Sequence, residues 1–421
     1  MTEEKNKTEN LPKGWKRVKL GEVLREPKKA AIKKNEYNKF ELLTVKLHLK
    51  GVAKTGKFPK WTPKGRPYFI RFENEFLLGR QNFHNGGFGI VDKSTNGLIA
   101  SNAISSFVST NKSNIKFIFY NLARRFLHKE FDFLMEGTGQ QEISVKKFLN
   151  LLINLPPLPE QQKIAEILET VDNTIEKTEK IIEKYKRIKQ GLMQDLLTKG
   201  IDENGKIRNE KTHKFKNSPL GKIPEEWEVV KLVEIVKNFQ YGISDTLLKK
   251  GKYKIIKMDD IQGWYVKIKN EQYVNIPLST FKKYKLNRGD ILINRTNSMQ
   301  FVGRPSYFDL KGDYVFASYL IRLFTNSKKV DNLFLTILIS FYHEKLKNLA
   351  TPAVQQANIN ANSLKAFQIP LPPLPEQKRI ASVLSQIDET IEKETAYKEK
   401  LQHLKKGLME DLLTGKVRVK I

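Results

Sequence analysis

The sequence predicts an α+β protein built as a tandem duplication, with two globular α+β domains separated by two long helices that form an antiparallel coiled coil of pseudo-two-fold symmetry. Three observations predict this arrangement. The segment that begins LPPLPEQQKIAEIL at Leu155 returns as LPPLPEQKRIASVL at Leu371, and the two copies align without a gap through GLMQDLLT and GLMEDLLT. A shorter pattern, Pro-x-x-Trp-x-x-Val-Lys-Leu-x-Glu, opens each half, at Pro12 and at Pro224. Apolar residues recur along both long segments with helical spacing.

The two long repeated segments are expected to be helices over 160–198 and 376–414. From Ile164 to Ile182 apolar side chains step by four and three, which is the a/d rhythm of a coiled coil. Pro159 and Pro375 suit a helix entrance, and each is followed by an acid where the helix dipole favours one. Because neither apolar stripe is wide enough to be buried all round, each helix needs a partner, and the obvious partner is the other copy.

The remaining segments complete the domain organisation. Short alternating runs such as Phe40 to Val45 mix with helix-like segments such as Ile115 to Lys129, punctuated by Gly, Asn and Pro, which indicates α+β domains. The expected divisions are a first globular domain (1–154), a first long helix (155–199), a linker (200–222), a second globular domain (223–370), and a second long helix with a tail (371–421).

The charge of the chain points to a polyanionic partner. The formal net charge is +29 and the isoelectric point is near 9.8. Neutralising phosphates releases counterions, so nucleic acid is favoured over an anionic membrane and over surface charge without a ligand. The absence of cysteine excludes disulfides, thiolate nucleophiles and cysteine-ligated zinc. No apolar run is long enough to cross a membrane and the start does not read as a secretory signal, so a cytoplasmic location is expected.

No pattern in the sequence indicates catalysis, a cofactor or a metal. The glycines at 86–89 and 137–139 lack the residues of a phosphate loop and the spacing of a dinucleotide fold, so they read as turn glycines. The run Asn154-Leu155-Pro156-Pro157 lacks the aromatic residue of an adenine methyltransferase loop. The six histidines are scattered without metal-ligand spacing. We therefore expect a binding protein that is not an enzyme.

Two polar loops and two basic-aromatic stretches are the candidate DNA-binding sites. The loops carry side chains that make paired hydrogen bonds to guanine and adenine edges, although contact with phosphates alone and a role in turn structure are alternatives. The loops contain Arg80, Gln81, Asn82, His84 and Asn85 in the first half, and Arg295, Thr296, Asn297, Ser298 and Gln300 in the second. The basic-aromatic stretches contain Lys60, Trp61, Lys64, Arg66, Tyr68 and Arg71 in the first half, and more weakly Lys282, Lys283, Tyr284, Lys285 and Arg288 in the second.

Taken together, these motifs resemble the specificity subunits of type I restriction-modification systems. The resemblance rests on the opening Trp pattern of each half, the Leu-Pro-Pro-Leu-Pro-Glu-Gln that begins each long helix, and the Gly-Leu-Met-x-Asp-Leu-Leu-Thr that ends it. A Gly-Asp-Ile-Leu run at 289–292 adds to it. The first half departs from this last motif, because it has Asn-Glu-Phe-Leu at 74–77, and that puts the correspondence of Arg80 with Arg295 in doubt.

The resemblance implies two target recognition domains, each reading one half of a bipartite, asymmetric site in double-stranded DNA. It also implies that the helix pair holds these domains at a fixed spacing, that two modification subunits bring S-adenosylmethionine and methylate adenine, and that restriction (motor-nuclease) subunits join for cleavage. A stand-alone regulatory DNA binder, which would need no partners, is one alternative. The recognition half of an enzyme with an unrecognised active site is the other.

Overall fold

The computed structural model describes residues 11–60, 65–131, 142–352 and 356–421. The chain divides into two compact units. Unit 1 comprises Met1–Lys180 and Thr395–Ile421, and unit 2 comprises Ile181–Glu394. Each unit therefore contains one globular domain, half of its own long helix and half of the other, and the predicted α+β class is confirmed in both.

Unit 1 is organised around a four-stranded antiparallel sheet of order β2-β9-β6-β7. Its inner face and helix α2 enclose a core rich in phenylalanine, in which Phe76, Phe88 and Phe107 are fully buried. The elements are β1 (Lys16–Lys19), α1 (Leu20–Val23), β2 (Leu24–Arg25), η1 (Lys34–Lys39), β3 (Leu43–Val45), β4 (Val52–Lys54), β5 (Tyr68–Ile70), β6 (Phe76–Gly79), η2 (Arg80–Asn85), β7 (Phe88–Ile90), β8 (Ile99–Ser101), β9 (Ile104–Ser109), α2 (Ile115–Leu127), α3 (Val145–Leu149) and β10 (Leu152–Leu155).

Unit 2 repeats this plan with a four-stranded sheet of order β14-β21-β17-β19 and adds a mixed sheet of order β16-β15-β20. The buried helix α7 covers the first sheet, and Phe334 and Leu338 are fully enclosed. The elements are β11 (Phe215–Ser218), β12 (Gly221–Pro224), β13 (Glu228–Lys231), α5 (Leu232–Ile235), β14 (Val236–Tyr241), β15 (Tyr253–Ile256), η4 (Met258–Asp260), β16 (Tyr273–Val274), α6 (Leu278–Tyr284), β17 (Ile291–Asn294), β18 (Thr296–Asn297), β19 (Pro305–Tyr307), β20 (Tyr314–Phe316), β21 (Leu320–Thr325), α7 (Asn332–Phe341), α8 (His343–Lys347), β22 (Thr351–Pro352), β23 (Ala357–Asn358), α9 (Ala361–Ala366) and β24 (Gln368–Leu371).

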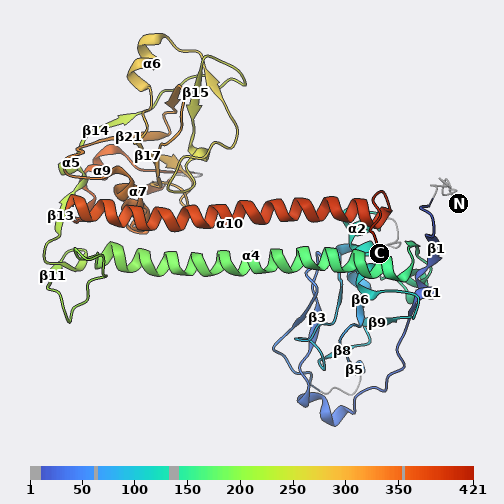
Figure 1. Ribbon diagram of the computed structural model, residues 1–421. Helices are drawn as coiled ribbons and strands as arrows, with labels where there is room; N and C mark the ends of the chain where they lie inside the picture. Colours follow the sequence, from blue (N-terminus) through green and yellow to red (C-terminus); the bar gives the residue numbers. More distant parts are fainter. Residues whose placement is uncertain (1–10, 61–64, 132–141, 353–355) are drawn as a thin grey trace. The chain divides into compact units, whose positions relative to one another are not determined.

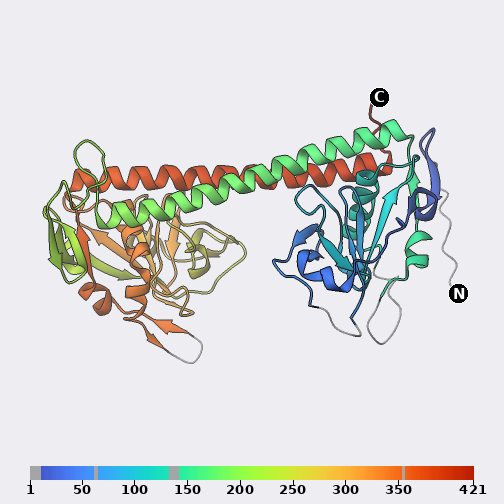
Figure 2. The same ribbon diagram turned by 90° about the horizontal axis from the view of Figure 1, so that it is seen from below.

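The two long helices are α4 (Leu158–Thr198) and α10 (Leu374–Thr414), each beginning two residues before its predicted start. Within each unit the two helices run side by side and antiparallel (Figures 1 and 2). In unit 1, Asp172 pairs with Lys405 at 2.6 Å, and Glu179, seven residues further on, pairs with Lys398, seven residues back. In unit 2 the equivalent pair joins Lys189 to Asp388. The predicted antiparallel helix pair is therefore confirmed.

The Trp of each opening motif and the Glu that begins each long helix form a buried polar contact in each unit. In unit 2, Glu376 accepts hydrogen bonds from Trp227 Nε1 at 3.2 Å and from Arg208 Nη1 at 2.5 Å. In unit 1, Glu160 accepts from Trp15 Nε1 at 3.2 Å and from Arg418 Nε at 2.6 Å. Each contact joins the start of one long helix to the segment that follows the other, which explains why these residue types recur.

The glutamine next to each of these acids has a second structural role. The side chain of Gln161 accepts from Asn114 N at 2.8 Å and donates to Pro156 O at 2.8 Å. Gln377 accepts from Asp331 N at 2.9 Å and donates to Pro372 O at 2.8 Å. Because Asn114 and Asp331 are the N-caps of α2 and α7, each glutamine ties a domain helix to its long helix. The repeated Glu-Gln pair is therefore a framework element in each unit.

The segment predicted as a linker, 200–222, has defined contacts within unit 2. It contains Arg208, which is buried against Glu376, and strand β11, which pairs with β12. Polar groups of this segment serve as hydrogen-bond partners within unit 2. The sequence carried a signal for this, because Gly205-Lys206-Ile207-Arg208 returns as Gly-Lys-Val-Arg at 415–418.

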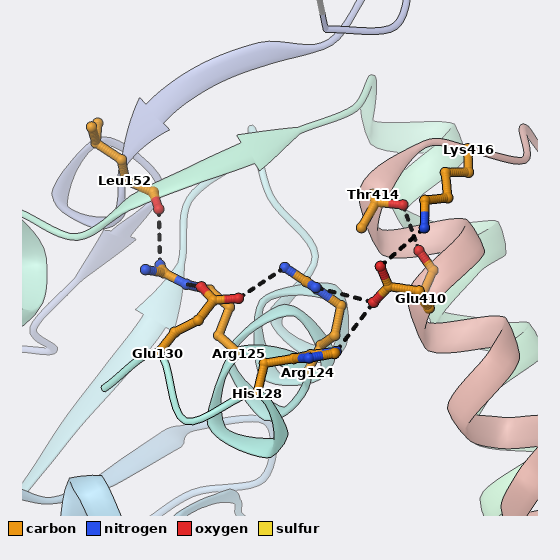
Figure 3. Close-up of polar contacts among 8 residues, drawn as sticks. All are labelled: Arg124, Arg125, His128, Glu130, Leu152, Glu410, Thr414 and Lys416. Carbon is orange, nitrogen blue, oxygen red and sulfur yellow. Dashed lines mark hydrogen bonds and ion pairs between the residues drawn. The ribbon is translucent and has the colours of Figure 1, made fainter. Parts of the chain in front are cut away.

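A charged cluster fixes the end of α10 to α2 inside unit 1 (Figure 3). Arg124 Nη1 lies 3.1 Å from Glu410 Oε2, and Lys416 Nζ lies 3.2 Å from Glu410 Oε1. Partial burial alone would raise the pKa of Glu410, but the hydrogen bonds from Lys416 and Arg124 outweigh it and lower the pKa. The carboxylate therefore stays charged, and the contact intact, at neutral pH.

Candidate nucleic-acid interface

The two predicted recognition loops leave equivalent strands of equivalent sheets. Arg80 directly follows β6, which lies between β9 and β7, and Arg295 directly follows β17, which lies between β21 and β19. The registers agree as well, since Phe76 pairs with Ile90 as Ile291 pairs with Tyr307. The doubt about whether Arg80 corresponds to Arg295 is thereby removed.

The motifs that precede the loops are also equivalent, although their letters differ. Asn74 adopts φ 66°, and Gly289 adopts φ 99°, so both start their strand from a left-handed residue. Asparagine tolerates this conformation better than other residues with a side chain. Glu75 accepts from Phe72 N at 3.0 Å and Asp290 accepts from Asn287 N at 2.9 Å. Asn-Glu-Phe-Leu at 74–77 therefore shares the left-handed first residue and the carboxylate hydrogen bond of Gly-Asp-Ile-Leu at 289–292.

In unit 1 the loop is a short 3-10 segment, η2, held from beneath by the fully buried Phe83. The glycines that follow are required by close approaches: a Cβ on Gly87 would lie 2.7 Å from Asn82 O. Arg80 Nε lies 2.7 Å from Glu142 Oε1, so its charge is partly compensated within the unit. Asn82 is exposed, whereas Gln81, His84 and Asn85 are half-buried beside it.

In unit 2 the equivalent arginine, Arg295, has no ion pair among the described residues. The Arg295 guanidinium lies over the ring of Tyr241, 4.9 Å from its centroid, and its Nε is buried without a hydrogen bond among the described residues. Thr296 Oγ1 accepts a hydrogen bond from Asn358, and Asn297 Oδ1 accepts one from Ser298 N. The side chains of Ser298 and Gln300 are exposed. Arg295 thus has hydrogen-bonding capacity that the described residues of unit 2 do not use.

Tyr241 was not among the predicted residues. It ends β14, and its hydroxyl accepts a hydrogen bond from Ala361 N at 3.0 Å, which fixes the ring beneath Arg295. Tyr241 and Arg295 lie far apart in the sequence, and a lone tyrosine at a strand end carries no signal of such a role.

The basic-aromatic stretches have mixed outcomes. Lys60 and Arg66 are exposed, Tyr68 lies in β5 with its ring against Tyr37, and Trp61 and Lys64 lie outside the described residues. In the second half Lys282 and Lys283 are exposed at the end of α6, whereas Tyr284 is half-buried and packs on Phe316. Among the residues that the structure describes, no hydrogen bond or ion pair joins either stretch to its loop.

The expectation that Arg71 contacts DNA is wrong. Its side chain is buried, with Nη1 donating to Ser106 Oγ at 2.8 Å and Nη2 donating to Ile104 O at 2.7 Å. Burial lowers the pKa of Arg71, and the charge of Glu75 opposes that shift. Arg71 therefore stabilises the fold of unit 1, and its guanidinium is not available to a ligand.

Other kinds of site find no support in the described part of the chain. No group of three or more His, Asp or Glu side chains there could hold a metal ion. No helix there is long and apolar enough to cross a membrane. What the two units share is a framework of repeated residues carrying loops whose sequences differ.

Comparison with known proteins identifies the family. The model of the type I restriction modification DNA specificity domain matches residues 12–187 and again residues 224–403. The chain belongs to the type I restriction-modification specificity family. The MjaVIII specificity subunit of Methanocaldococcus jannaschii is 32% identical over 428 residues, which cover 97% of this chain and 94% of that protein. The putative MjaX specificity subunit of the same organism is 35% identical over 74% of this chain and 70% of that one.

A solved structure supports the fold of this specificity protein. The type I restriction-modification S subunit from M. genitalium aligns over 100% of both chains with a TM-score of 0.63 at 15% identity. The two family matches coincide with the two copies found in the sequence. Members of the family are non-catalytic DNA-recognition subunits, so the chain is a recognition protein and not an enzyme.

Proposed function

We propose that this specificity protein reads a bipartite, asymmetric site in double-stranded DNA, one half-site with each globular domain, and holds two modification subunits and the restriction subunits around it in the cytoplasm. The observation that carries the proposal is the pair of loops at equivalent strand ends. They present Arg80 in one unit and Arg295 in the other, with different neighbours. Equivalent positions support one docking mode, and different side chains support two different half-sites.

The first test replaces Arg295 by alanine. Its guanidinium is preoriented by Tyr241 and makes no ion pair among the described residues, so it is free to donate two hydrogen bonds to a guanine. We expect preference for one base pair of one half-site to fall by about 1–3 kcal/mol, with the other half-site unchanged. Sequencing the methylated adenines of cells that carry the variant with its modification subunit measures this.

Arg80→Ala is the matched variant for unit 1. Because the Arg80 guanidinium already pairs with Glu142, we expect a smaller loss of base preference, confined to the other half-site. If Arg295→Ala instead weakened binding evenly on all sequences and made the salt dependence shallower, Arg295 would be a phosphate contact. If neither variant changed the methylated site, the two loops would not form the recognition surface.

A repeated exposed stripe supports the docking of two identical partners. On α4 in unit 2, Ile181 and Ile188 are 40% and 38% exposed, one heptad apart, with the exposed Lys184 between them. On α10 in unit 1, Tyr397 and Leu404 are 48% and 51% exposed. These residues are equivalent in the two copies. Apolar side chains kept at the surface in both copies fit a protein partner better than DNA.

Replacing each apolar pair by glutamine tests this docking. Ile181→Gln with Ile188→Gln should leave one bound modification subunit, and adding Tyr397→Gln with Leu404→Gln should leave none. Stability should be unchanged, because the side chains are already exposed and glutamine is a good helix former. Native mass spectrometry of the reconstituted complex gives the stoichiometry. Arg187→Gln, at another exposed position of α4, is the control. A fourfold variant that still binds two subunits would contradict the docking of the modification subunits on these apolar residues.

A further inference from the structure

The turn between β3 and β4 in unit 1 has an unusual backbone. Its central residues, His48 and Leu49, both adopt φ 57°, and Lys50 N donates to Leu47 O at 3.3 Å to close the turn. Two successive left-handed residues define a type I′ turn, which normally carries Asn-Gly or Gly-Gly. A histidine and a leucine are unfavourable there, so the local sequence does not explain the conformation.

Contacts with the Arg80 loop hold the turn in place. The amide of His48 donates to Asn85 O at 2.8 Å and the amide of Leu49 donates to Gly86 O at 3.1 Å. A Cβ on Gly86 would lie 3.0 Å from Leu49 N, so glycine at this position permits the approach. The turn and the Arg80 loop are therefore built against each other as one surface.

The side chains of the turn divide into an anchor and an exposed tip. Leu49 packs against the core of unit 1, which fixes the turn from inside. Lys46, His48 and Lys50 are exposed, and no hydrogen bond or ion pair of their side chains is recorded in the described residues. The unfavourable backbone thus places an imidazole, flanked by two lysines, next to Asn85. Backbone strain that surrounding contacts maintain is typical of functional sites.

We propose that this turn, Lys46–Lys50, is a second DNA-reading element of unit 1, with His48 donating from its imidazole to a purine acceptor in the major groove and Lys46 and Lys50 contacting the flanking phosphates. A neutral imidazole carries one N–H donor, and purines present N7 there, with O6 on guanine. The cationic flanks match the phosphate backbone. The proposal rests on the function proposed above, and it adds a residue outside the Arg80 loop.

The test is His48→Gly, because glycine adopts φ 57° without strain. A merely structural role predicts that the variant is at least as stable as the parent and recognises the same sequence. A reading role predicts equal or higher stability together with a roughly 5- to 10-fold loss of discrimination at one base pair of the half-site read by unit 1. Thermal unfolding and methylation mapping of the complete chain with its modification subunit give both readouts.

Two further variants separate the possible outcomes. Lys46→Ala with Lys50→Ala should weaken binding of a duplex carrying the mapped site and make its salt dependence shallower, with the same base preferences. His213→Ala, in unit 2, is the histidine control and should change neither readout. If the parent reads a bipartite site but His48→Gly reads it with the same preferences, this inference fails alone. If the parent complex shows no bipartite site, the proposed function fails.

Discussion

Replacing Arg208 by alanine should destabilise unit 2 by about 3–5 kcal/mol, the usual cost of leaving one partner of a buried ion pair without the other. Glu376 is 2% exposed and receives two hydrogen bonds from Arg208, so the variant would leave a charge that neither water nor another cation reaches. Urea unfolding of the full chain measures the loss in the free energy of unfolding. The readout is tryptophan fluorescence, and the signal of Trp227 is compared with that of the other tryptophans.

Arg418→Ala is the matched control in unit 1. Glu160 is as deeply buried as Glu376, but the Arg418 side chain is 40% exposed against 9% for Arg208, so water can enter the place that Arg418 leaves. We expect the smaller effect there. Glu376→Gln with Arg208→Ala should recover part of the stability, because the amide is neutral and still accepts from Trp227. Equal losses for the two arginine variants would contradict the assigned importance of burial.

Lengthening both long helices by one turn should lengthen the spacer between the half-sites by one or two base pairs. Four residues inserted after Lys180 and four after Ala396, equivalent positions in the two copies, add about 6 Å along the pair. Base pairs are about 3.4 Å apart, so the half-site sequences stay the same while their separation grows. Methylation mapping in cells that carry the insertions shows the new spacer.

Insertion into one helix only provides the control. Each unit takes half of each helix, so lengthening α4 alone sets the two halves out of register and should abolish site-specific methylation. Four residues inserted after Lys311, in an exposed segment of unit 2, should leave the spacer unchanged. An unchanged spacer with full activity in the doubly lengthened variant would mean that the helices do not set the distance.

The framework of both units could be predicted because repetition reveals it. Residues that recur at fixed spacing, such as Trp15 with Trp227 and Glu160 with Glu376, mark contacts that both copies need. The spacing of apolar residues along α4 and α10 then gave the helices and their need for a partner. These signals are local in sequence or repeated, so they survive without a structure.

The loops were harder to predict because their chemistry depends on burial. The sequence pattern of a basic-aromatic run does not distinguish an arginine that faces solvent from one that faces the core. Arg71 faces the core. The equivalence of Asn74 with Gly289 was hidden because two residue types share one backbone conformation. The contacts of Arg295 with Tyr241 and of Arg80 with Glu142 join residues distant in sequence, so only the fold shows them.

The interleaving of the two units has a consequence for how the chain is synthesised. Unit 2 is a continuous stretch, 181–394, whereas unit 1 needs residues 395–421, which are made after all of unit 2. At about 5–20 residues per second, the ribosome completes unit 1 roughly twelve to fifty seconds after its first 180 residues have appeared. During that interval Glu160 lacks Arg418, and Ile164 and Leu168 lack the apolar residues of α10. A chain that stops early therefore exposes an incomplete core in its oldest part.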